Sequence, residues 1–277
     1  MGYWLPAVLF LLLLYMRLEA SWLEVTTRVV STRAGLRVAV LSDLHIAFCR
    51  VSAERIKKQM AMHQPDLVVF LGDAVDRPRH IPRAARWLQI AANGVPAIAT
   101  LGNHDHRLFL RHPDQRERYK QALEAAGFRL CVNESLRFAT GSKALDLTVL
   151  DDDRYGVRAL PDGLAPPLTS HSGAAPTETP VQPTPPHLLL THNPQRLADL
   201  PEAHADFAAA GHFHGGQIWM PFGLEFRLFR TEPLGRAGIR RGLHTINGTP
   251  AWLSRGIGNV LFPLRLGARP ELTFLEF

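Results

Sequence analysis

The sequence contains little cysteine and no apolar run long enough to cross a membrane. Its two cysteines are Cys49 and Cys131. Two are too few for a disulfide framework, so we expect free thiols in a reducing compartment. The apolar run from Tyr3 to Met16 is shorter than the roughly 20 residues that a helix needs to span a bilayer. The low cysteine content excludes a scaffold held together by disulfides. The length of the apolar run does not define its function, so its flanking residues have to be considered.

The flanks of the apolar run favour a membrane anchor over a secretory signal peptide. No lysine or arginine precedes the run, and Leu18-Glu19-Ala20 is a poor cleavage site. We therefore expect residues 1–22 to anchor the protein, by spanning the membrane or by lying on it. Positive charge follows the run, at Arg17, Arg28, Arg33 and Arg37. The positive-inside rule then places the globular part of the protein on the cytoplasmic side of the cytoplasmic membrane.

The overall composition is that of a globular protein with a basic balance. Hydrophobic residues make up 46% of the 277 residues and charged residues 20%. The net charge of +6 suits an anionic partner, such as nucleic acid, lipid head groups or a phosphorylated substrate. Charge alone does not choose among these three.

Strand and helix patterns alternate in the first half of the chain. Apolar strands are predicted at 36–41, 67–71 and 96–101, and helices at 52–63, 81–93 and 113–126. This order indicates βαβ units and a largely parallel sheet. Later strands, without long helices between them, are predicted at 128–132, 145–150, 187–191, 206–210 and 271–277. They indicate a second sheet packed on the first, in one α/β domain over residues 35–277.

Residues 161–186 interrupt this pattern. The segment is rich in Pro, Thr, Ser and Ala and has almost no large apolar side chains. Such a composition cannot bury enough surface to fold. We expect a flexible surface insertion between two core strands, because polar clusters that belong together lie on both sides of it.

Five polar clusters each follow a predicted strand. They are Ser42-Asp43-Leu44-His45, Gly72-Asp73-Ala74-Val75-Asp76-Arg77, Gly102-Asn103-His104-Asp105, Thr191-His192-Asn193 and Gly211-His212-Phe213-His214-Gly215-Gly216-Gln217. In an open α/β sheet, ligands bind outside the carboxyl ends of the strands. Carboxylate, amide and imidazole groups gathered there suit Mn, Fe, Zn or Ni better than Ca. Their number exceeds what one ion needs, which implies two ions that share a bridging carboxylate.

The order of these motifs resembles that of the calcineurin-like metallophosphoesterases, from about Leu36 to the C-terminus. The resemblance implies a four-layer αββα sandwich, in which two mixed β-sheets are flanked by helices. It assigns one metal to Asp43, His45 and His214, the other to Asn103, His192 and His212, and the bridging carboxylate to Asp73. Two divalent ions are expected; manganese is the expected metal, with zinc or iron as alternatives.

The resemblance also implies a mechanism. His104 matches the catalytic histidine of the family, Asp76 its orienting partner, and Arg77 a phosphate-contacting arginine of some members. A hydroxide that bridges the two metals would attack phosphorus in line, and a protonated His104 would donate to the leaving oxygen. No serine or cysteine nucleophile is required.

A finer resemblance concerns the substrate. The extended motif from Gly211 to Gln217, with Ser254-Arg255-Gly256-Ile257-Gly258 and Arg269-Pro270-Glu271, is similar to a bacterial membrane-associated branch of the family. That branch includes enzymes of the UDP-2,3-diacylglucosamine pyrophosphatase type. This chain departs from the branch at Phe213, where threonine is usual. Residues 218–229, which are rich in aromatic and aliphatic side chains, are either a hairpin packed on the core or an apolar, basic rim beside the metals.

Three functions follow from these patterns. The first is a dinuclear metal-dependent phosphoesterase or pyrophosphatase that acts on a small phosphate or on a membrane- or lipid-linked one such as UDP-2,3-diacylglucosamine. The second is a nuclease or a cyclic-nucleotide phosphodiesterase of the same superfamily. Nucleic acid is not the expected partner, because we expect no appended DNA-engaging domain or coiled coil. The third is a non-catalytic metal-binding scaffold, against which the complete set of ligands and His104 argues.

Overall fold

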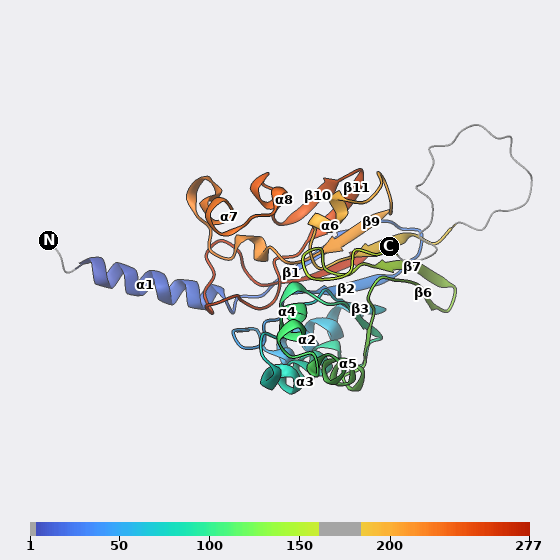
Figure 1. Cartoon of the computed structure of the whole chain (residues 1–277), viewed down its shortest axis with the longest axis horizontal. Coiled ribbons are helices and arrows are strands. Elements are labelled where there is room, and N and C mark those ends of the chain that lie inside the picture. The colour runs from blue at the N-terminus through green and yellow to red at the C-terminus, as the bar shows by residue number, and fades with distance from the viewer. Residues whose placement is uncertain (1–3, 161–183) are drawn as a thin grey trace, which may run out of the picture.

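Two six-stranded mixed sheets form the centre of the molecule. The structure is a computed structural model that describes residues 4–160 and 184–277 (Figure 1). The first sheet has the order β1 (Glu24–Val29), β12 (Glu271–Glu276), β2 (Arg37–Leu41), β3 (Leu67–Phe70), β4 (Ala97–Ala99), β5 (Phe128–Leu130). The second has the order β10 (Gly242–Ile246), β11 (Thr249–Leu253), β9 (Phe207–Ala210), β8 (His187–Leu190), β7 (Lys143–Val149), β6 (Glu134–Thr140).

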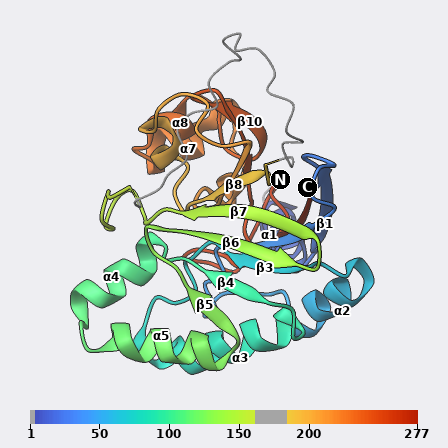
Figure 2. The same ribbon diagram turned by 90° about the vertical axis from the view of Figure 1, so that its right-hand side faces the viewer.

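Helices cover the outer faces of both sheets (Figure 2). The first sheet carries α2 (Ala53–His63), α3 (Ile81–Ala92), α4 (Asn103–Arg111) and α5 (Gln115–Ala125). The short helices α6 (Gln195–Ala198), α7 (Leu224–Phe229) and α8 (Pro233–Arg236) lie on the side of the second sheet. The predicted four-layer αββα sandwich is confirmed.

The strands that lie between layers bury both of their faces. In β2, Val38 and Val40 join the apolar core between the two sheets, whereas Ala39 and Leu41 join the core beneath the helices. Side chains of a strand alternate between its faces, so a strand buried on both sides reads as a continuous apolar run. Strands β2 to β5 run parallel to one another, as do β7, β8, β9 and β11. Within each of these two sets of parallel strands, the carboxyl ends therefore lie at the same end of the sheet.

Most predicted elements of the core are present, and the exceptions are local. Helix α2 begins at the predicted cap, where the Ser52 hydroxyl accepts a hydrogen bond from the Arg55 N–H. The hairpin interpretation of residues 218–229 is wrong, because the segment forms a 3-10 turn at Pro221–Gly223 and then α7. Sequence patterns missed α4, which begins inside a ligand motif, and the strands β1, β6, β10 and β11. Of the predicted insertion at 161–186, residues 161–183 lie outside the described residues.

Helix α1 (Trp4–Glu19) projects from the body of the molecule in Figure 1. In the described part of the chain, no helix combines the length and the apolar character needed to cross a bilayer. The last turn of α1 is buried at Met16 and Glu19. The Met16 carbonyl accepts a hydrogen bond from the Arg265 N–H (3.0 Å), and the Glu19 carboxylate accepts one from the Ala268 N–H (2.9 Å). The helix is thus fastened at its C-terminal end to the loop 259–268, and β1, which follows it, already belongs to the first sheet.

Candidate metal centre

The carboxyl ends of five strands deliver the predicted metal ligands to one buried site. Asp43 and His45 follow β2, Asp73 follows β3, Asn103 follows β4, His192 follows β8, and His212 and His214 follow β9. All seven side chains are buried, in a region of the protein where charged groups are rare unless they are paired or coordinate metal.

The first group of donor atoms consists of Asp43, His45 and His214, whose ligand atoms all lie within 4.8 Å of one another. The Nε2 of His214 lies 3.3 Å from the Asp43 carboxylate, and the Nε2 of His45 lies 3.5 Å from Asp73. His45 Nε2 and His214 Nδ1 are buried and have no hydrogen-bond partner among the described residues. Orphaned imidazole nitrogens in a dry site are what a metal ion would satisfy.

The second group surrounds His192. Its Nδ1 donates to the Leu71 carbonyl (2.7 Å), so that its Nε2 faces Asn103 Oδ1 (3.1 Å) and Asp73 Oδ2 (3.2 Å). His212 Nδ1 lies 2.9 Å from the same amide oxygen. A His192 protonated on Nδ1 alone would direct a lone pair toward two oxygens that also carry lone pairs. A cation between these atoms resolves the repulsion, so the donor set fits a second metal that shares Asp73 with the first group.

The carboxylates also set the protonation of the histidines. Burial lowers the pKa of His45 and of His192, but hydrogen bonds and charges from Asp73 outweigh it and raise both to about 10, with Asp76 contributing at His45. The pKa of Asp73 is held well below its usual range by His192, His104 and His45, against the opposing effect of its burial. Burial keeps the pKa of His214 well below its ordinary value. A site that attracts protons this strongly also attracts divalent cations, which would replace them.

Tight turns bring the ligands to this position. Asp43, His45, Asp73, His212 and His214 all have positive φ, between 37° and 74°. Aspartate and histidine tolerate this left-handed region better than most residues. Glycines precede several ligands because a Cβ there would collide with a neighbouring ligand. One added at Gly102 would strike Asp73, and one at Gly211 would strike Ser42 and Asp43.

Asp105 is a structural residue that sequence reasoning did not identify. Its buried carboxylate accepts hydrogen bonds from the backbone N–H groups of Asp73 (2.8 Å), Ala74 (3.1 Å), Val75 (3.2 Å) and Gly102 (3.1 Å). It thereby ties the loop after β3 to the start of α4. Its place in a Gly-Asn-His-Asp motif that starts a helix was a signal for such a cap.

Asp76 joins two histidines. His104 Nδ1 lies 2.5 Å from Asp76 Oδ1, and His45 Nδ1 lies 3.3 Å from Oδ2. Because both Nδ1 atoms donate to the carboxylate, the Nε2 of each ring is directed away from it. His104 lines the cavity at the metal centre, as expected of a group that meets the substrate. One ligand atom of His104 also lies within 4.8 Å of donor atoms of His45 and Asp73.

Arg77 lies elsewhere. Its side chain is exposed and lines a separate surface pocket with Asp76, Arg79, Leu108 and Arg111, not the cavity at the metal centre. Its contact with phosphate stays a prediction from the resemblance.

Glu232 is a second residue that the sequence did not reveal. Its carboxylate lies 3.0 Å from His212 Nε2, on the side of the ring opposite Asn103. The hydrogen bond to His212 lowers the pKa of Glu232, although burial opposes it. A carboxylate behind a metal-binding histidine fixes its tautomer and strengthens it as a ligand. Glu232 comes from the connection between α7 and α8, where the sequence pattern Thr-Glu-Pro reads only as a helix start.

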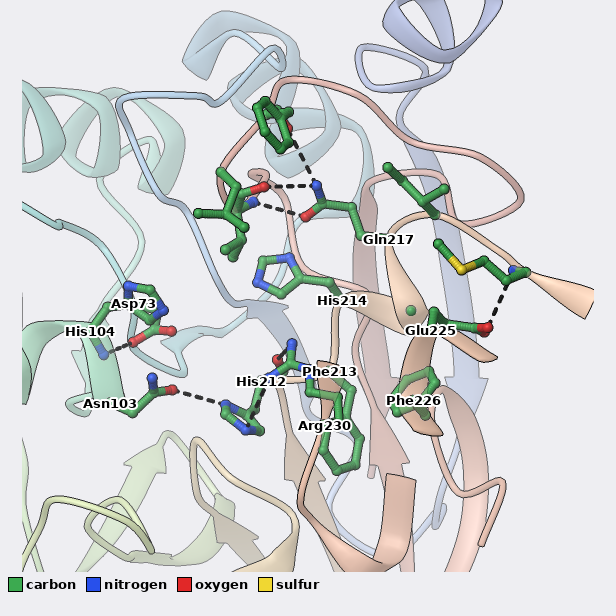
Figure 3. Close-up of a pocket in the computed structure, with 16 residues that line it drawn as sticks. Asp73, Asn103, His104, His212, Phe213, His214, Gln217, Glu225, Phe226 and Arg230 are labelled. Atoms are coloured by element: carbon green, nitrogen blue, oxygen red, sulfur yellow. Dashed lines mark hydrogen bonds between the residues drawn. The ribbon is translucent and has the colours of Figure 1, made fainter. Parts of the chain in front are cut away.

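A cavity of about 470 Å³ opens from the metal centre (Figure 3). Asp73, Asn103, His104 and His212 form its inner end. The remaining wall is mainly apolar. Its apolar side chains are Phe213, Ile218, Met220, Phe226, Val260, Leu261 and Phe262, and its other residues are His214, Gly216, Gln217, Glu225 and Arg230. Phe213 is fully buried and packs edge-on against Phe226, with ring centroids 5.7 Å apart. The phenylalanine between the two histidines thus connects the metal-binding turn to α7.

The family of the chain is settled by a match over residues 36–224 to the calcineurin-like phosphoesterase family. The chain belongs to this family. Membership makes it a metal-dependent phosphohydrolase, in agreement with the predicted enzyme class. The match begins next to the first predicted strand and includes all seven predicted metal ligands.

Three relatives illustrate the range of the family around this chain. The uncharacterized metallophosphoesterase YkoQ of Bacillus subtilis is 31% identical over 87% of this chain and 83% of its own length. The phosphodiesterase YaeI of Escherichia coli is 26% identical over 93% of this chain and 89% of its own. The UDP-2,3-diacylglucosamine pyrophosphatase LpxG of Chlamydia muridarum is 25% identical over 68% of this chain and 66% of its own.

Proposed function

We propose that this phosphohydrolase cleaves a phosphoester or pyrophosphate bond in a substrate that carries an apolar group, a lipid-linked phosphate of the UDP-2,3-diacylglucosamine kind. The observation that carries the proposal is the cavity at the metal centre. Its inner end offers carboxylate, amide and imidazole groups, and its wall offers Ile218, Met220, Leu261 and Phe262. A substrate with a phosphate at one end and an acyl chain at the other matches both parts.

The residues of the inner end have separate tasks in this reaction. When bound, two divalent ions, expected to be manganese, would lower the pKa of a water molecule and neutralise charge on the phosphoryl oxygens. His104, held by Asp76, would give a proton to the leaving oxygen. Its backbone N–H donates to Asp73 (2.7 Å), so the general acid and the bridging carboxylate share one rigid turn. Phe213, whose ring centroid lies 5.4 Å from that of His212, would limit the access of water to this ring.

Membrane association is part of the proposal. Leu5, Val8, Leu11 and most other apolar side chains of α1 are exposed. The loop 259–268, to which the last turn of α1 is fastened, also carries Leu261 and Phe262 of the cavity wall. An apolar helix that enters the lipid beside the cavity would bring the cavity close to the membrane surface. We propose that α1 holds the catalytic domain at the cytoplasmic membrane, on its cytoplasmic side.

The test compares acylated and deacylated forms of one nucleotide sugar as substrates for the purified, manganese-loaded protein. We expect kcat/KM to be at least about tenfold higher for the acylated form, because an apolar pocket discriminates by this much for small apolar differences. Leu261→Ser should reduce the preference. Leu243→Ser is the matched control, since Leu243 is similarly exposed, at 60% against 70%, but does not line the cavity. Equal rates on both forms, or efficient cleavage of DNA, would contradict the proposal.

A further inference from the structure

Arg230 lies at the junction between the metal centre and the apolar part of the cavity. It follows the last residue of α7, is partly buried, and lines the cavity together with Asp73, Asn103 and His104. Figure 3 draws Arg230 beside His212, with the other three on the opposite side of the cavity. Its Nη2 donates to the His212 carbonyl (3.1 Å).

The hydrogen bonds of this guanidinium are incomplete. Arginine carries five N–H donors in a planar fork. Arg265 shows what a purely structural arginine looks like in this fold, because it is fully buried and donates to Asn259 and to the carbonyls of Arg255, Ala268, Gly256 and Gly258. Arg230 donates to one carbonyl and its Nη1 lies 3.5 Å from His212 Nε2, and among residues 4–160 and 184–277 it forms no ion pair with a carboxylate.

The positive charge of Arg230 beside the metal centre would be stabilised by a bound anion. Burial lowers the pKa of Arg230, and the charges of Glu232, Asp43 and Asp73 only partly offset this effect. Two cations in the centre would repel the guanidinium unless a negative group lay between them. A phosphoryl group is such an anion, and the fork of arginine matches two of its oxygens.

We propose that Arg230 binds non-bridging phosphoryl oxygens of the substrate and thereby sets which phosphate lies at the metal centre. This inference rests on the proposed phosphoester chemistry. It gives Arg230 the task that the resemblance assigned to Arg77, which is exposed and lines a different pocket. The connector between α7 and α8 contacts His212 through both residues: Arg230 at its carbonyl and at its ring Nε2, and Glu232 at the same Nε2.

The test uses the full-length, manganese-loaded protein with Arg230→Gln, Arg230→Lys, Arg77→Gln and the control Arg227→Gln. Arg227 is an exposed arginine of α7, three residues before Arg230, and does not line the cavity. Three quantities are measured: kcat/KM on bis(p-nitrophenyl) phosphate, the inhibition constant of inorganic phosphate, and metal ions bound per chain.

We expect Arg230→Gln to lower kcat/KM by about 100-fold, the scale of losing one charged donor to the reacting group. It should weaken phosphate inhibition by about tenfold or more and leave metal content unchanged. Arg230→Lys should restore part of the phosphate affinity, and Arg227→Gln should match the unmodified protein.

Three results would overturn the inference: Arg230→Gln behaving like Arg227→Gln, a larger effect of Arg77→Gln than of Arg230→Gln, or loss of metal in Arg230→Gln in proportion to its activity. The last would make Arg230 only a support of His212. If the unmodified protein hydrolysed no phosphoester, the proposed function would fail. Calorimetric titration of inorganic phosphate into the same variants would still decide whether Arg230 binds phosphate.

Discussion

His104 Nδ1 and Asp76 Oδ1 lie 2.5 Å apart, and the same carboxylate receives His45 Nδ1 through its other oxygen. One side chain therefore orients both a predicted metal ligand and the predicted general acid. The pKa of Asp76 stays below its ordinary range because the hydrogen bonds of His104 and His45 exceed the effect of burial. The two histidines are thus held by a carboxylate that remains charged at neutral pH.

His104→Ala should separate catalysis from metal binding. We expect turnover to fall by about a hundredfold or more, the scale of general acid catalysis, with the metal content unchanged. The loss should be smaller for substrates with good leaving groups, which need little protonation. Elemental analysis and a series of substituted phenyl phosphodiesters measure both effects. His104 also lies close to donor atoms of His45 and Asp73. If the His104→Ala protein lost a metal ion, His104 would be a metal ligand and not only the general acid.

Asp73→Asn should affect both metals. Asp73 is close to His45 on one side and to His192 on the other, at 3.5 Å and 3.2 Å. We expect a loss of turnover of about a thousandfold or more and a lower metal content. The assignment as the bridging carboxylate would be refuted by a variant that binds two metals and turns over near the normal rate.

Glu232→Ala should weaken metal binding without removing a ligand. His212 would lose the acceptor that fixes its ring, which typically reduces metal affinity by about 10–100-fold. Glu225→Ala is the control, since Glu225 is a buried carboxylate of the same region that pairs with Arg240 rather than with a histidine. Metal-buffered titrations of both variants make the comparison. Equal affinities in the two would show that Glu232 does not support His212.

Two N-terminal truncations should behave differently. Removing residues 1–14 deletes the exposed part of α1 and should release the protein from membranes with an unchanged melting temperature. Removing residues 1–21 also deletes Met16 and Glu19, which are buried against the loop 259–268. The loss of apolar burial and of two hydrogen bonds should lower the free energy of unfolding by about 2–4 kcal/mol. Thermal unfolding and membrane fractionation test this. Equal stability of the two proteins would mean that the last turn of α1 contributes nothing to the domain.

Neither cysteine should react in the folded protein at pH 8. Burial raises the pKa of Cys49 to about 11 and that of Cys131 to about 12. Because the thiolate is the reactive form and a raised pKa keeps the thiol protonated, reaction should begin only as the pH approaches these values. A colorimetric thiol reagent should detect no thiol before denaturation and both thiols after it. Rapid labelling of the native protein at pH 8 would contradict the expectation.

The sequence predicted the core of this fold because the relevant strands are buried on both faces. Runs such as 67–71 are continuous and apolar, and their ends carry the polar clusters, so strand positions and ligand positions came from one pattern. The edge strand β6 escaped because it alternates half-buried and exposed residues in a polar segment. Helix α4 escaped because its first residue is a ligand, Asn103, whose motif looks like a loop.

The supporting residues could not be found in the same way. Glu232 and Arg230 contact His212 from the connection between α7 and α8. This segment has no periodic pattern of apolar residues from which its position near β9 could be predicted. The apolar run 218–229 was consistent with an apolar rim beside the metals, but it did not predict that the segment forms a turn followed by a helix. Two of its phenylalanines lie in different environments, since Phe226 is buried against Phe213 and Phe222 is exposed.

The positive φ angles at five of the seven predicted ligands limit how the centre could be redesigned. Changing metal selectivity by ligand exchange usually means trying Glu for Asp, or Cys for His, at each position. Here the new side chain would need to coordinate the ion and also accept a left-handed backbone, for which Asp, Asn and His are the favoured non-glycine residues. At Asn103 and His192, whose φ values are negative, a new side chain would need only to coordinate the ion. Directed evolution toward another metal should therefore accept substitutions at these two positions first.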